Sequence, residues 1–141
     1  MPPTAADSTI THARLLKLDG QHVVIAVPKT DYQVQLVLDG GLPANTQPGD
    51  AIAGVVRANA RRVDVMQAGG RFIEPVYGRP RRIQGRIVAG DLANNAIVVD
   101  CGVRVHAKLM PQQKTGDFAA GQLVGFDIQS GATFTPTACE S

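Results

Sequence analysis

Hydrophobic and polar residues alternate along most of this chain with a period of two. Successive side chains of a β-strand point to opposite faces of a sheet, so this alternation is typical of strands with one buried face. No stretch of twelve residues carries the spacing of an amphipathic helix. The pattern predicts an all-β protein with strands at 13–18, 22–27, 32–38, 51–57 and 61–66, then at 82–89, 96–100, 102–109, 122–128 and 132–135.

The second half of the chain echoes the first at an offset of about 72 residues. Arg14 matches Arg86, and Gly49 matches Gly121, although few other positions are identical. What repeats is an order of strands and turns, and a repeat of this kind constrains the architecture. It predicts either two barrels in tandem or one pseudo-twofold barrel in which the two copies are intertwined about one core.

Five strands per copy, with a glycine turn before the fourth strand, resemble the oligonucleotide/oligosaccharide-binding (OB) fold. The turns that carry the resemblance are Gly49-Asp50 and Gly121-Gln122. The helix that usually bridges the third and fourth strands of that fold has little room between Gly40 and Gly49. The resulting division of the chain is a disordered N-terminal arm (1–12), a first OB-like barrel (13–65), an Arg-rich connector (66–81), a second OB-like barrel (82–136) and a C-terminal tail (137–141).

The composition is that of an ordinary globular protein, with 44% hydrophobic and 18% charged residues in 141. Fifteen glycines and nine prolines in short clusters indicate many turns. The two cysteines, Cys101 and Cys139, do not imply a disulfide framework. The first residues do not have the pattern of a secretory signal, and no apolar run reaches transmembrane length, so we expect a cytoplasmic protein without membrane contact.

Positive charge is concentrated in one stretch of the chain, although the net charge is only +2. Between residues 57 and 86 there are eight arginines, opposed only by Asp64 and Glu74. Arginine makes forked contacts with phosphate and stacks on bases, so this stretch predicts contact with nucleic acid. The expected contacts are Arg57, Arg61, Arg62, Arg71, Arg79, Arg81, Arg82 and Arg86. The alternatives are a solvated linker, or arginines that pair with acids elsewhere in the chain, including Asp39, Asp50, Asp100 and Asp117.

The strand expected at 102–109 carries a second set of basic residues. Arg104, His106 and Lys108 share one face because side chains alternate, while valine, alanine and leucine occupy the other. In the OB fold the second and third strands form the usual surface for single-stranded nucleic acid. The resemblance therefore implies that these three residues contact phosphates or bases. The simpler interpretation is the polar outer face of a half-buried strand.

Aromatic residues, on which single-strand binders stack bases, are scarce. Phe72 and Tyr77 are the only ones interleaved with positive charge. The segment Arg82-Ile83-Gln84-Gly85-Arg86 fits the R-x-x-x-R motif of PilZ domains, small barrels that bind cyclic dinucleotides, but the second motif of that family is absent. Neither metal-ligand spacing nor a catalytic motif is present, so we expect no enzyme activity, cofactor or metal.

The leading expectation is a non-enzymatic module that binds single-stranded RNA or DNA weakly and without sequence preference. One alternative is a structural or protein-interaction module, including a homo-oligomer that pairs through exposed edge strands. The other is a degenerate PilZ-like barrel for a cyclic dinucleotide.

Overall fold

The computed structural model describes residues 9–42 and 44–137, and nearly all of their regular structure is β-strand, which confirms the all-β prediction. The strands are β1 (Ile10–Asp19), β2 (His22–Ala26), β3 (Gln33–Leu38), β4 (Ala51–Asn59), β5 (Asp64–Val65), β6 (Phe72–Glu74), β7 (Tyr77–Gly78), β8 (Arg82–Asp91), β9 (Ala96–Asp100), β10 (Arg104–Lys108), β11 (Leu123–Asp127) and β12 (Thr133–Thr137). Two single-turn 3-10 helices, η1 (Leu92–Asn94) and η2 (Thr115–Asp117), complete the regular structure. Within the described ranges, no helix is both long and apolar enough to cross a membrane.

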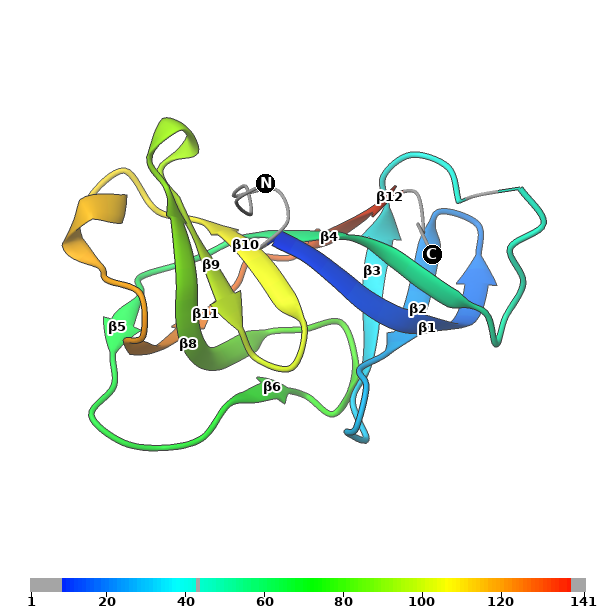
Figure 1. The fold of residues 1–141 in the computed structure, drawn as a ribbon, viewed down its shortest axis with the longest axis horizontal. Coiled ribbons are helices and arrows are strands. Elements are labelled where there is room, and N and C mark those ends of the chain that lie inside the picture. Colours follow the sequence, from blue (N-terminus) through cyan, green and yellow to red (C-terminus); the bar gives the residue numbers. More distant parts are fainter. Residues whose placement is uncertain (1–8, 43, 138–141) are drawn as a thin grey trace, which may run out of the picture.

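Five strands form a closed barrel in one lobe of the molecule (Figure 1). β1 pairs with β2, β2 with β3, β3 with β12, β12 with β4, and β4 with β1 again. The strand expected at 132–135 was assigned to the second barrel, and that assignment is wrong: as β12 it closes the first barrel. Its Phe134 is fully buried and lies over Gly54, where an added Cβ would come within 2.5 Å of the ring.

The second lobe is built around β8, which pairs with β9 and β11. β9 pairs with β10, and β10 runs parallel to the C-terminal half of β4. An isolated bridge between Ala60 and Ile128 then joins the end of β4 to the end of β11. β4 therefore serves both lobes, pairing with β1 through its first half and with β10 through its second. Each lobe contains a strand from the other half of the chain, so the halves are intertwined rather than separate.

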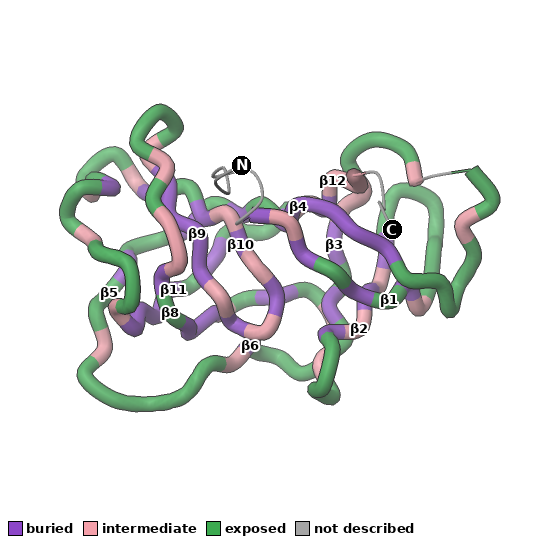
Figure 2. The backbone as a smooth tube through the Cα atoms, in the orientation of Figure 1, coloured by how far each residue is buried: buried purple, intermediate pink, exposed green. Residues whose placement is uncertain are grey.

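A single hydrophobic core runs through both lobes (Figure 2). Leu15, Ile25 and Phe134 in the first lobe, and Ile97 and Phe126 in the second, are among its fully buried side chains. In strands with one buried face, such as β3 and β10, the inward residues follow the predicted alternation, whereas β4, β9 and β11 have consecutive buried residues on both faces.

The expected limits of the first barrel and of the N-terminal arm need correction. Residues 10–12 belong to β1, and the buried hydroxyl of Thr11 accepts a hydrogen bond from the Arg104 backbone N–H at 2.7 Å. The remainder of the predicted arm, 1–8, lies outside the described residues. At the other end, Thr137 closes β12, and positions 138–141 of the predicted tail also lie outside them. The predicted connector, 66–81, contains β6 and β7.

The residues that are identical in the two halves make the same contact in each. The Arg14 guanidinium donates to the Gly49 carbonyl at 2.6 Å, and the Arg86 guanidinium donates to the Gly121 carbonyl at 2.9 Å. Both glycines have φ in the left-handed region, at 99° and 93°, where other residues are strained. Each arginine thus fastens the turn that starts the fourth strand of its half.

Candidate nucleic-acid interface

Three of the arginines expected to bind nucleic acid form ion pairs within the protein, and another donates to a backbone carbonyl. Ion pairs join Arg62 to Asp64 at 3.0 Å, Arg71 to Asp100 at 3.2 Å and Arg82 to Asp127 at 3.1 Å. Arg86 binds the Gly121 carbonyl. All four side chains retain solvent contact, but each already has a partner within the protein. The ion pair with Asp100 is one that the alternative interpretation of this stretch, in which the arginines pair with acids elsewhere in the chain, names.

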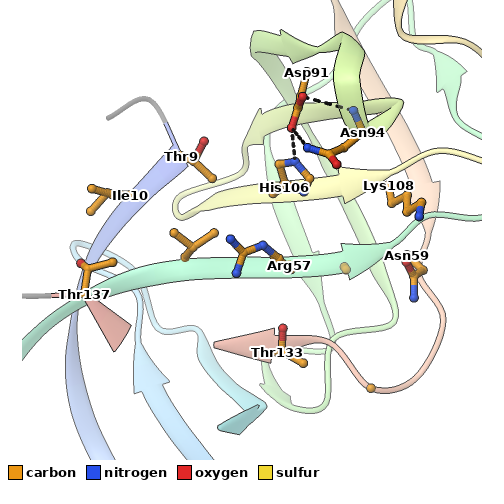
Figure 3. A pocket seen from close by; sticks show the side chains of 13 residues that line it. Thr9, Ile10, Arg57, Asn59, Asp91, Asn94, His106, Lys108, Thr133 and Thr137 are labelled. Carbon is orange, nitrogen blue, oxygen red and sulfur yellow. Dashed lines mark hydrogen bonds and ion pairs between the residues drawn. The ribbon is translucent and has the colours of Figure 1, made fainter. Parts of the chain in front are cut away.

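A first cleft lies on the outer face of β10, β4 and β12 (Figure 3). It has a volume of about 640 Å³. His106 of β10 lies beside Arg57 of β4, and Arg57 lies beside Thr133 of β12. Lys108 lies beside Asn59, two residues further along the same pair of strands and on the same face. The register brings three of the expected contacts, Arg57, His106 and Lys108, into one cleft although they come from different halves of the chain.

An internal acidic partner holds His106 in this cleft. Its Nε2 lies 2.9 Å from Oδ2 of Asp91, which also accepts a hydrogen bond from the Asn94 side chain at 2.8 Å (Figure 3). The Asn94 hydrogen bond, and after it that of His106, hold the pKa of the Asp91 carboxyl below its usual value of 3.8. The sequence analysis did not identify Asp91, although aspartate three residues before the amide of Asn94 is a capping pattern that could have done so.

Arg57 and Lys108 are the exposed cations of the first cleft. Nη1 of Arg57 donates to Oγ1 of Thr135 at 2.9 Å, and that hydroxyl donates in turn to Asp39 at 3.2 Å. Lys108 makes no ion pair within the described part of the chain. Arg104 is half-buried and is not among the residues that line this cleft.

A second cleft, of about 550 Å³, lies between the outer face of β3 and the connector. β7 runs parallel to β3, which places Tyr77 beside Gln33. Tyr77 is 62% exposed, and Arg79 and Arg81 line the same cleft together with His22. Neither arginine forms an ion pair with any residue in 9–42 or 44–137, and none of the described residues lining the cleft is acidic.

The remaining expected residues lie away from these clefts. Arg61 is exposed and lines neither of them. Phe72, the other aromatic interleaved with arginines, is half-buried on β6 and does not line the second cleft. The two clefts themselves are neighbours, because Gly131 in the turn before β12 lines both.

Chemistry of other kinds finds few suitable groups in the described residues. Burial raises the pKa of the Cys101 thiol to about 12, so the thiol is neutral at physiological pH and a poor nucleophile. Across 9–42 and 44–137, histidine, cysteine, aspartate and glutamate nowhere gather in a group of three that could hold a metal ion. In the R-x-x-x-R segment, Arg82 and Arg86 already have the partners given above.

The fold and the two clefts define an all-β protein built around a closed five-stranded barrel, with basic residues gathered on its outer surface. The chain matches no protein-family model, and no curated protein matches it.

Proposed function

We propose that this protein binds single-stranded nucleic acid without sequence preference, and that the second cleft is the centre of the interface. The observation that carries the proposal is the exposed ring of Tyr77 beside Arg79 and Arg81, two cations without an acidic partner among the described residues. Stacking of a base on an aromatic ring contributes about 1 to 3 kcal/mol. The arginines are placed to contact the phosphates on either side of that base.

The distribution of ion pairs supports this choice of surface. Arg62, Arg71 and Arg82 have carboxylate partners, whereas Arg79 and Arg81 have none in the described part of the chain. A carboxylate partner offsets part of the positive charge that a phosphate would meet, although each exposed pair of this kind contributes little by itself. Unpaired arginines beside an exposed aromatic ring are therefore the better candidates among the eight in this stretch.

Sequence-independent binding follows from the kinds of groups present. An aromatic ring can stack on any base, since every base has a π face. Arginine contacts to phosphate likewise carry no sequence information. The OB resemblance agrees with this proposal, because β2 and β3 border the second cleft through His22 and Gln35. We also propose a cytoplasmic location and a non-enzymatic role.

The test is fluorescence anisotropy with labelled RNA and DNA oligomers of about 12 nucleotides, at several salt concentrations. We expect binding that weakens as salt rises, because phosphate contacts release counterions. Tyr77→Ala, and separately Arg79→Gln with Arg81→Gln, should each weaken binding by about tenfold for all sequences. Arg62→Gln is the matched control, because Arg62 is exposed, ion-paired and outside both clefts.

Absent or salt-independent binding would reject the proposal. A concentration-dependent dimer in sedimentation, without affinity for nucleic acid, would then favour the assembly module. Pairing through free strand edges would have to use short strands such as β5, β6 or β7, because each strand of the closed barrel already has two neighbours. A thermal upshift with a cyclic dinucleotide would favour the PilZ-like alternative instead.

A further inference from the structure

We infer that a bound strand does not end in the second cleft but continues over Gly131 into the first cleft, where Arg57 and Lys108 hold its phosphates. The inference rests on the proposed function and deepens it: the ligand is a single strand long enough to reach both clefts, with a base held in one and its backbone in the other.

The junction between the clefts is the first step of the argument. Gly131 is exposed and lines both clefts, while Ala132 lines the second and Thr133 the first. Three consecutive residues thus lead from one cleft to the other. A Cβ built on Gly131 would meet no atom within 4 Å, so the space above this turn is open. Glycine leaves that space without a side chain that could obstruct the strand.

The chemistry of the first cleft suits a sugar-phosphate backbone rather than a base. None of the described residues that line it is Phe, Tyr or Trp, and its one aromatic ring, the imidazole of His106, is mostly buried and bound to Asp91. Arg57 and Lys108 supply positive charge, while Asn59 beside Lys108 and Thr133 beside Arg57 supply polar groups. Asp91, the single carboxylate among the described residues that line the cleft, already accepts hydrogen bonds from Asn94 and His106 (Figure 3).

The second cleft supplies what the first lacks. Tyr77 offers an exposed ring, and its neighbouring arginines have no acidic partner in the described part of the chain. A short oligomer gains most from this cleft, because stacking and phosphate contact are both available there. Only a longer oligomer gains the additional contacts at Arg57 and Lys108. The inference therefore makes the contribution of the first cleft depend on the length of the strand.

The experiment compares oligomers of about 4 and about 16 nucleotides, the range of site sizes of single OB folds. Fluorescence anisotropy measures the affinity for the long oligomer, and chemical-shift titration of the ¹⁵N-labelled protein measures the affinity for the short one. The variants are Arg57→Gln with Lys108→Gln, Tyr77→Ala, and Arg62→Gln as the control. All of these side chains are exposed, and thermal unfolding checks that each variant folds.

For the long oligomer we expect Arg57→Gln with Lys108→Gln to weaken binding about tenfold and to reduce the salt slope by about 1.4, since each lost single-strand phosphate contact contributes about 0.7. For the short oligomer the same variant should bind like the parent protein. Tyr77→Ala should weaken both. The change in salt slope separates lost phosphate contacts from a general structural defect.

Three results would overturn the inference. If the Arg57 and Lys108 variant binds both lengths like the parent protein, or weakens both equally, the first cleft is not a continuation of the second, whereas the proposed function stands as long as Tyr77→Ala weakens binding. If the parent protein binds neither length, the proposed function fails and the inference fails with it.

Discussion

The third strands of the two halves, β3 and β10, are paired in equivalent ways but have different outer faces. Each pairs with the strand before it and runs parallel to a strand from the other half of the chain. β3 presents Gln33, Gln35 and Val37 outward, whereas β10 presents Arg104, His106 and Lys108. The inward faces of both are apolar. Backbone pairing and core packing thus constrain one face, and the other is left to differ.

The two lobes also acquire their surface chemistry by different routes. In the second lobe the basic residues lie on the strand itself, and Asp91 at the end of β8 positions the imidazole of His106. In the first lobe the strand is neutral, and the connector supplies Tyr77, Arg79 and Arg81 to the cleft beside it. A segment outside the barrel can therefore provide a binding surface that the barrel strand lacks.

The largest expected effect concerns the strand that the second half contributes to the first lobe. Phe134→Ala removes a fully buried ring, which costs about 3 to 5 kcal/mol of unfolding free energy. Urea unfolding should still show one cooperative transition, because the halves share β4, β12 and one core. Phe72→Ala, at a half-buried position on the periphery, is the control with a smaller loss. Two separate transitions would show that the lobes unfold independently.

A smaller effect is expected where the lobes are most alike. Arg14→Ala and Arg86→Ala each remove one hydrogen bond from a turn carbonyl, and each should cost about 0.5 to 1.5 kcal/mol. The two losses should add in the double variant, since the sites lie in different lobes. Arg61→Ala, exposed and outside both clefts, should change the unfolding free energy by less than about 0.5 kcal/mol. A loss confined to one lobe would show that the two contacts are not equivalent.

The smallest expected effect depends on pH and distinguishes Asp91 from Asp19, which ends β1 as Asp91 ends β8. Folding lowers the pKa of Asp91, so its contribution is present above 3.8 and is lost as pH falls through the folded-state value. Asp91→Asn should therefore be less stable than the parent protein at neutral pH, and the difference should disappear in strong acid. Asp19→Asn is the matched control in urea unfolding. A difference that persists in strong acid would mean that the Asp91 charge is not its source.

The ten strands outside the connector could be predicted from the sequence, and so could the residues from which the clefts draw their charge. The alternation of Arg104, His106 and Lys108 with buried neighbours is local, because adjacent side chains of a strand must point to opposite faces. What the sequence analysis missed was the partner of His106, because Asp91 ends β8, which lies two strands away from β10 in the sheet. It also grouped the arginines as one patch, whereas the fold separates them.

Periodicity by itself indicated the core-facing residues of strands with one buried face, such as β10, because burial of one strand face is a property of a short segment. Only the tertiary structure buried both faces of β4, β9 and β11. Only the tertiary structure decided which strands are neighbours, since β12 pairs with β3 and β4 through contacts between distant parts of the chain. It also decided which arginines are neutralised: the carboxylates that pair with Arg71 and Arg82 lie 29 and 45 residues away in the sequence. Spacing along the chain does not fix the distance between an arginine and its carboxylate partner, because the order of the strands in the sheet sets that distance.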